Sequence, residues 1–298
     1  AFKAAIRDNT RLVFAETIGN PGLDVLDIPA VSAIAHEASL PLMVDSTFTT
    51  PYLMQPLDLG ADLIVHTATK FLSGQGIVIG VLLVDGGKFD WDVSSKFPSL
   101  SEPYAGFHKL VFTVEFGPAA FFARARKEGL RDFGACMSPT TAFHILQGME
   151  TLGLRMQRHV DNTREIVSFL QQQEMVTAVA YPELEGHPDK ALAGQLLPRG
   201  CGAVFTFELK GGRAAGIAFV DALKLFSHLA NVGDAKSLVI HPASTTHHRM
   251  DNDALVAAGI SSGTIRLSIG LEQSADLVAD LKQGLRAAEK VASREADQ

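Results

Sequence analysis

Cysteine is almost absent from this sequence of 298 residues, which contains only Cys136 and Cys201. The two lie far apart and form no CxxC pair, so neither a disulfide framework nor a cysteine metal site is expected. We predict two reduced structural thiols. The histidines give no metal site either, because the spacing of His241, His247 and His248 is not that of zinc ligands.

Basic residues are too few and too scattered for a nucleic-acid-binding protein. The chain has 26 Lys and Arg against 33 Asp and Glu, for a formal charge of −7, and it contains no run of five basic residues. We therefore expect a small-molecule partner and no nucleic acid.

Long apolar runs are missing as well. The longest fall far short of the roughly 20 residues that cross a bilayer, and the first residues lack the apolar core of a signal peptide. We expect no membrane contact and a cytoplasmic location. The chain starts at Ala1 rather than Met and enters a helix-like segment at once, so we also expect a natural amino-terminal portion to be missing.

What the sequence does contain is enough apolar material for a large core. With 47% hydrophobic and 20% charged residues, it reads as one large globular domain or two.

Two short apolar runs organise the first part of the chain. Residues 42–44 and 63–65 are typical of parallel strands covered on both faces. Ligands bind beyond the carboxyl ends of such strands. Asp45 follows the first run, Lys70 follows the second, and Asn20 lies in a turn after a third predicted strand at residues 11–16. We therefore expect Asn20, Asp45 and Thr67 to lie near Lys70 at one sheet edge.

A carboxylate, an amine and nearby hydroxyls are what pyridoxal 5′-phosphate (PLP) requires. Its aldehyde bonds to a lysine, its pyridine nitrogen keeps a proton beside a carboxylate, and its phosphate accepts hydrogen bonds from hydroxyls. Lys70, Asp45, Thr67 and Thr69 could supply these groups. On that pair of charges alone, a helix cap and a solvated lysine are the alternative interpretation.

The remainder predicts a second, smaller unit. Residues 77–84 read as a further buried strand, residues 89–117 as an aromatic excursion, and Ser138 as the start of a helix with Phe143, Leu146 and Met149 on one face. We place a domain boundary after residue 152, giving domains 1–152 and 153–298. The second should be α+β, with a half-buried strand at 202–209, further strands at 237–242 and 264–269, and helices at 160–173, 214–229, 254–259 and 275–290.

Three segments in order carry a family resemblance: residues 16–21 (ETIGNP), 44–51 (VDSTFTTP) and 67–70 (TATK). Together they resemble the fold-type I PLP enzymes that handle homocysteine, cystathionine and methionine. The resemblance implies an α/β fold, with the mostly parallel sheet of a PLP-dependent transferase major domain, incomplete at its amino-terminal end, and a smaller α+β carboxy-terminal domain. It also implies that relatives carry roughly another third of a chain at the start, with a phosphate-binding glycine loop and tyrosines near the cofactor.

The resemblance assigns roles residue by residue. Lys70 resembles the Schiff-base lysine and catalytic base, Asp45 the partner of the pyridine nitrogen, and Asn20 a donor to the ring hydroxyl oxygen. Thr67 and Thr69 resemble phosphate or near-phosphate ligands. On the substrate side the family pattern points to Arg266, as the clamp for the carboxylate, and to Asn231.

Residues 231–247 and the long segment 89–116 are most similar to the sulfhydrylase branch of that family. This implies a γ-replacement in methionine biosynthesis: O-acetylhomoserine with sulfide, or a small thiol, gives homocysteine, or methionine, and acetate. A cystathionine γ-synthase or a methionine or cystathionine γ-lyase on the same scaffold is the alternative. A catalytically inactive folded fragment is the alternative from another class. A homodimer or homotetramer is expected from the resemblance alone.

Overall fold

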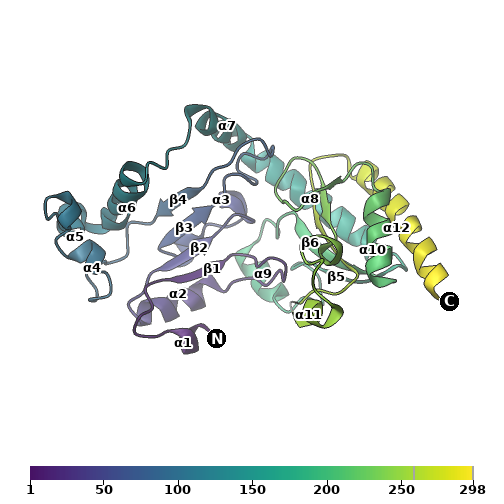
Figure 1. Ribbon diagram of the computed structural model, residues 1–298, viewed down its shortest axis with the longest axis horizontal. Helices are drawn as coiled ribbons and strands as arrows, with labels where there is room; N and C mark the ends of the chain where they lie inside the picture. Colours follow the sequence, from purple (N-terminus) through teal and green to yellow (C-terminus); the bar gives the residue numbers. More distant parts are fainter. Residues whose placement is uncertain (258, 297–298) are drawn as a thin grey trace.

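Two β-sheets lie side by side along the long axis of the molecule in a computed structural model, which describes residues 1–257 and 259–296 (Figure 1). The first sheet lies toward one end, beyond which residues 98–125 extend, and the long carboxy-terminal helix α12 (Ser274–Ala296) lies at the other end. Within the described residues, no helix is long and apolar enough to cross a membrane.

The first sheet has the order β1-β2-β3-β4, formed by β1 (Val13–Glu16), β2 (Leu42–Asp45), β3 (Leu63–His66) and β4 (Leu82–Asp85). The first three strands are parallel and β4 is antiparallel to β3. Parallel strands end at the same edge, so the residues that follow β1, β2 and β3 meet there. The sheet is mostly parallel, as predicted.

Helix α2 (Ile28–Glu37) makes the crossover from β1 to β2. Asp27 caps it by accepting a hydrogen bond from the Ala30 amide at 3.0 Å, and a proline occupies its first turn. Its apolar side buries Ile28, Val31 and Ala35 against the sheet. The short helices α1 (Phe2–Ala5), α3 (Thr50–Leu53) and the 3-10 turn Pro56–Leu59 complete this part.

The prediction of a buried strand at 77–84 is wrong in its extent and its burial. Only residues 82–85 form a strand, and the Ile79 side chain is 86% exposed, with Ile77 and Val81 exposed as well. The reason is position: β4 is an edge strand in the described chain, so the apolar segment before it has no neighbouring strand to pair with.

Aromatic side chains pack the excursion after β4, as the sequence predicted. Trp91 contacts Phe89 and Phe97 edge to face and stacks on Phe121 at 5.1 Å between ring centroids. They form a second core against Leu63 of β3. The helical elements here are α4 (Pro98–Ser101), Ala105–Phe107, α5 (Phe112–Phe116), Gly117–Ala119, α6 (Ala120–Ala125) and a π-helix at Arg126–Asp132.

Two consecutive helices, α7 (Pro139–Glu150) and α8 (Leu152–Leu170), lead to the second sheet. Ser138 caps α7 by accepting a hydrogen bond from the Thr141 amide at 3.1 Å, as its position predicted. The apolar face of α7 is present but open: Phe143 is 58% and Leu146 60% exposed. The break between the helices lies at Thr151, beside the predicted domain boundary, which stays a prediction.

The second sheet has the order β5-β6-β9-β8-β7 and is antiparallel except for the β7 and β8 pair. Its strands are β5 (Val176–Ala180), β6 (Val204–Leu209), β7 (Ser227–His228), β8 (Leu238–Ile240) and β9 (Thr264–Ser268). Helices α9 (Lys190–Leu196), α10 (Gly212–Ala222) and α11 (Asn252–Ala257) connect them, with the 3-10 turn Pro242–Ser244.

Two expectations for this part need correction. Strand β6 is not half-buried, because it lies inside the sheet between β5 and β9 and residues 204–207 are buried on both faces. Helix α10 ends at Ala222 rather than near residue 229, since Asp280 of α12 accepts hydrogen bonds from the backbone amides of residues 224–226 and β7 follows.

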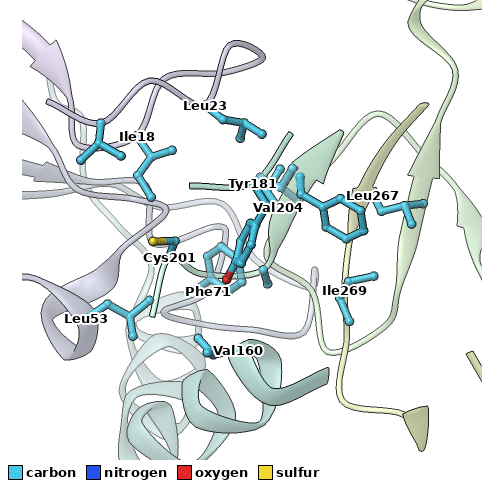
Figure 2. Close-up of a cluster of buried hydrophobic side chains, with 14 of the residues drawn as sticks. Ile18, Leu23, Leu53, Phe71, Val160, Tyr181, Cys201, Val204, Leu267 and Ile269 are labelled. Carbon is cyan, nitrogen blue, oxygen red and sulfur yellow. The ribbon is translucent and has the colours of Figure 1, made fainter. Parts of the chain in front are cut away.

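The main hydrophobic core joins the two sheets. Figure 2 shows Ile18 and Leu53 from the first part of the chain beside Tyr181 and Val204 from the second. The buried Tyr181 hydroxyl donates to the Gly202 carbonyl at 3.0 Å, which satisfies its only donor. A shared core holds residues from both sheets in a fixed relation at the cleft between them.

Candidate active site

A cleft of about 210 Å³ opens where β1, β2 and β3 end, and the second sheet closes its other side. Residues far apart in sequence share its wall, because β9 and the segment before β8 face the strand ends of the first sheet. The lining residues are Glu16, Ile18, Asn20, Asp45, Thr47, Phe48, Thr67, Lys70, Ala230, Asn231, Val232 and Arg266.

Lys70 follows β3 in a compact turn, in which its amide donates to the Thr67 carbonyl at 3.0 Å. Its side-chain amine reaches into the cleft and donates to the Asn231 amide oxygen. Burial, and then the charge of Arg266, lower the pKa of this amine below its ordinary value. A larger share of Lys70 is therefore neutral, the form in which an amine acts as a nucleophile or base.

The segment that carries Asn231 packs tightly on the lysine. A Cβ added at Gly233 would lie 2.8 Å from the Phe71 nitrogen and 2.9 Å from the Lys70 Cβ, so only glycine permits this approach. Gly233 also has a φ of +78°, which glycine adopts without strain. The sequence at this point therefore fixes Asn231 next to Lys70.

Asp45 ends β2, and in the strand register it lies opposite Glu16 of β1. One carboxylate oxygen of Asp45 accepts a hydrogen bond from the Thr47 amide at 2.8 Å. Partial burial, and then the negative charge of Asp45, raise the pKa of Glu16. Two neighbouring carboxyl groups thus line the same cleft as the amine of Lys70.

Arg266 comes from β9 in the second sheet and donates to the Asn20 side-chain oxygen at 3.1 Å. Burial lowers the pKa of this guanidinium. Among the described side chains, no carboxylate lies within salt-bridge distance of this guanidinium. The cleft therefore presents a cation without an ion-pair partner, and its planar group can donate two parallel hydrogen bonds. An anionic substrate group matches that arrangement.

The two predicted threonines differ in position. Thr67 lines the cleft, and its amide donates to the Thr47 hydroxyl at 2.8 Å. The Thr69 hydroxyl turns to Gly80 instead, accepting from its amide at 3.0 Å and donating to its carbonyl at 3.3 Å, and it is not part of the cleft wall. A cofactor role for Thr69 stays a prediction.

Of the other predicted residues, Asn20, Asp45, Lys70, Asn231 and Arg266 all line this one cleft. Sequence reasoning did not single out Glu16 or Thr47. The signal for both was present, since Glu16 ends the strand beside Asp45 and Thr47 follows Asp45 by two residues.

The residues fit PLP on the grounds of their own chemistry. The cleft offers a partly buried lysine amine with a lowered pKa, a carboxylate at a strand end, the side-chain oxygen and amide groups of Asn20, and threonine groups next to the lysine. These are the groups that would hold the aldehyde, the pyridine nitrogen and the ring substituents. With a parallel α/β sheet behind them, they define the class as a PLP-dependent enzyme of the α/β type.

The chain belongs to the family described as Cys/Met metabolism PLP-dependent enzyme, whose sequence pattern matches residues 1–286. It is 46% identical over 294 residues to the O-acetyl-L-homoserine sulfhydrylase of Leptospira meyeri, covering 96% of this chain and 66% of that protein. It is 46% identical over 287 residues to the homocysteine synthase of Schizosaccharomyces pombe, covering 96% and 67%. The chain spans about two thirds of the length of these relatives.

Solved structures agree. A putative O-acetylhomoserine (thiol)-lyase from Campylobacter jejuni, which carries N'-pyridoxyl-lysine-5'-monophosphate, superposes with a TM-score of 0.89 at 34% identity, covering 95% of this chain and 68% of that one. Cystathionine γ-synthase from Xanthomonas oryzae pv. oryzae gives 0.76 at 36% identity, covering 95% and 65%. The predicted family, fold class and PLP dependence of that family are confirmed.

Proposed function

We propose that this chain is the lysine-bearing part of a γ-replacement enzyme that converts O-acetylhomoserine and sulfide, or a small thiol, to homocysteine, or methionine, and acetate, a step of methionine biosynthesis. The carrying observation is the cleft itself, where Lys70 and Asp45 from one sheet face Arg266 from the other. The relatives named as sulfhydrylases and as homocysteine synthase support the choice of reaction.

The residues divide the work between the cofactor and the substrate. Lys70 would hold the cofactor's aldehyde and, once freed, take the proton from the substrate's α carbon, a role that its lowered pKa favours. Asp45 would hold a proton on the pyridine nitrogen, Asn20 would hydrogen-bond the ring hydroxyl oxygen, and Thr67 would lie on the phosphate side. Bound PLP would supply an electron sink for the carbanion.

On the substrate side, Arg266 would bind the α-carboxylate through its planar guanidinium. Asn231 contacts the Lys70 amine in the structure and would lie between that amine and the substrate. Because Arg266 and Lys70 come from different parts of the fold, only the assembled cleft could hold the carboxylate and the α carbon of a bound amino acid at the same time.

Trapping the cofactor on the lysine tests the proposal. The chain is incubated with PLP and reduced with borohydride, and the modified peptide is identified by mass spectrometry. We expect the label on Lys70 and its complete loss in Lys70→Ala, with Lys236→Ala as the matched control, since Lys236 is exposed on the loop beyond Asn231. A label that persists at the same level in Lys70→Ala would overturn the assignment.

A cystathionine γ-synthase or a γ-lyase is the second candidate, favoured by the superposition on the Xanthomonas enzyme. Product analysis separates the reactions. Homocysteine formed from O-acetylhomoserine and sulfide supports our choice, cystathionine formed with cysteine supports the synthase, and a 2-oxo acid with ammonia supports a lyase. Absence of tight PLP binding in a titration would instead favour an inactive folded fragment.

We further propose a homodimer or homotetramer, supported by exposed apolar side chains on α7 and α8, where Phe143, Leu146 and Leu154 face outward. Light scattering should give a mass above that of one chain, and Phe143→Ser with Leu146→Ser should shift it toward the monomer. A monomeric wild-type chain at the highest soluble concentration would contradict this.

A cytoplasmic location is proposed too, since both cysteines are free thiols.

A further inference from the structure

Arg155, in the first turn of α8, directs its guanidinium away from the cleft and onto the backbone that carries the lysine. Its Nη1 donates to the Phe71 carbonyl at 2.7 Å and its Nη2 to the Leu72 carbonyl at 3.1 Å. The same Nη2 donates to the Gly148 carbonyl of α7 at 2.7 Å, and Nε donates to the Thr151 hydroxyl at 3.2 Å. One side chain thus ties the Lys70 turn to the junction of α7 and α8.

The charge of Arg155 has no acidic partner among the described side chains, and burial lowers the pKa of its guanidinium. Burying a cation without a counter-ion costs free energy, which its four hydrogen bonds offset. An arginine on the surface would not bond these backbone carbonyls, which water would then hydrate. We infer that this arginine is buried here in order to hold the turn that carries the lysine.

Two glycines make the close packing possible. Gly74 has a φ of +70°, and a Cβ there would collide with the Arg155 guanidinium. A Cβ at Gly148 would lie 2.5 Å from the carbonyl oxygens of Leu72 and Ser73. The turn is also closed from within, because the Gly74 amide donates to the Lys70 carbonyl at 2.8 Å. A shift of Arg155 would therefore be transmitted to Lys70 rather than absorbed.

We propose that Arg155 is a positioning residue for Lys70: through the carbonyls of Phe71 and Leu72 it sets where the lysine amine stands in the cleft. Arg155 does not line the cleft. The amine it positions donates to Asn231, and Arg266, Asp45 and Glu16 line the same cleft. The inference deepens the proposed function and rests on it for the role of Lys70.

Competitive acetylation of lysines by acetic anhydride across a pH series tests the proposal without any cofactor. Mass spectrometry of the chain gives the midpoint pH at which Lys70 becomes reactive, with Lys236 as the internal reference. In Arg155→Met we expect the midpoint for Lys70 to move upward toward that of an ordinary lysine. In parallel, the rate of borohydride-fixed labelling of Lys70 by PLP should fall about tenfold, since small displacements of a reacting group cost rate steeply.

Arg158→Met is the matched control, because Arg158 lies on the same helix but donates to the Glu272 carbonyl and the Gln273 side chain. It should leave both readouts for Lys70 unchanged. Arg155→Lys, which keeps the charge but loses the fork of donors, should give intermediate values and serves if the methionine variant fails to fold. A wild-type midpoint for Lys70 in the Arg155 variants, or an equal shift in Arg158→Met, would overturn the proposal. If wild-type Lys70 takes no PLP label, the proposed function fails, while the acetylation midpoint still decides the role of Arg155.

Discussion

The two ends of the molecule bury their apolar surface to different degrees. In the second sheet, β6 lies inside the sheet, and Phe207 on it is only 1% exposed and packs on Phe219 of α10. In the first sheet, both edge strands leave apolar side chains open, such as Phe14 at 52% exposure. Most residues of the cleft nevertheless come from the first sheet and the segments that follow its strands.

The well-packed part of the molecule and the part that carries most of the reactive groups are therefore not the same. The second part of the chain is packed well enough to hold Arg266 in place, whereas the first part presents the reactive groups on a sheet with open apolar surface. The shared core of Figure 2 links them, so the well-packed part supports the geometry of the other. Substitutions of the same type should therefore have unequal effects at the two ends.

A pair of phenylalanines gives the largest expected contrast. Phe207→Ala should lower the free energy of unfolding by about 3–5 kcal/mol, because it leaves a cavity in a filled core. In the monomeric chain at low concentration, Phe143→Ala on the open face of α7 should change it by no more than about 0.5 kcal/mol. Urea titrations followed by circular dichroism measure both. Equal losses would show that the α7 face is buried in solution.

The helix that joins the two ends should make stability depend on pH. His159 of α8 is fully buried between Phe71 and the Ile269 carbonyl, and burial lowers its pKa to about 4. The unfolded chain takes up its proton near pH 6.5, before the folded chain does, so the unfolded state binds more protons between these values. Stability is therefore full above pH 6.5 and falls as the pH drops toward 4, by up to about 3 kcal/mol.

Replacement of the histidine isolates this effect. The free energy of unfolding of His159→Gln should depend less on pH between 6.5 and 4.5 than that of the wild-type chain. The matched control is His248→Gln, since His248 is exposed and should keep the wild-type slope. A wild-type slope in His159→Gln would show that its proton affinity does not change on folding.

Two aspartates that bind backbone amides provide the next contrast. Asp280 is buried and accepts from the amides of Lys224, Leu225 and Phe226 in the second part of the chain, so Asp280→Asn should cost about 2 kcal/mol. Asp27 caps the exposed start of α2 with one bond, and Asp27→Asn should cost only a few tenths, about 0.3 kcal/mol, because asparagine is also a good cap. Thermal unfolding ranks the two, and a reversed order would contradict the contrast.

The smallest effect should come from a surface ion pair. The Lys3 Nζ atom of α1 lies 2.8 Å from the Glu37 Oε2 atom of α2, and both side chains are well exposed. Lys3→Ala should lower stability by no more than about 0.5 kcal/mol, and added salt should remove the difference. A larger loss that survives high salt would mean that α1 is held more firmly than its contacts indicate.

Local patterns predicted much of the site. Short apolar runs located β2 and β3, and the residues after them, Asp45 and Lys70, do lie at one edge. The capping serine placed the start of α7 correctly. These features depend on a few neighbouring residues, which is why reading the sequence locally was sufficient.

Other features depend on what lies beside an element. Residues 77–81 have the composition of a buried strand but stand at a sheet edge, and β6 was expected to be half-buried but lies between two strands. Thr69 is one residue from Lys70, yet its hydroxyl is taken by Gly80. No local pattern distinguishes an edge from a centre or shows where a hydroxyl will find its partner.

The sequence by itself determined the strand ends, the lysine and carboxylate at them, and the family, because each rests on residues close together in the chain. Only the tertiary structure decided that Arg266 donates to Asn20 and that Glu16 lies beside Asp45 in the sheet. It also decided that Arg155 donates to the Phe71 carbonyl in the turn after Lys70. Those contacts join residues that the chain separates, so they depend on the pairing of β1 with β2 and on the packing of β9 and α8 against the segments that follow the strands of the first sheet.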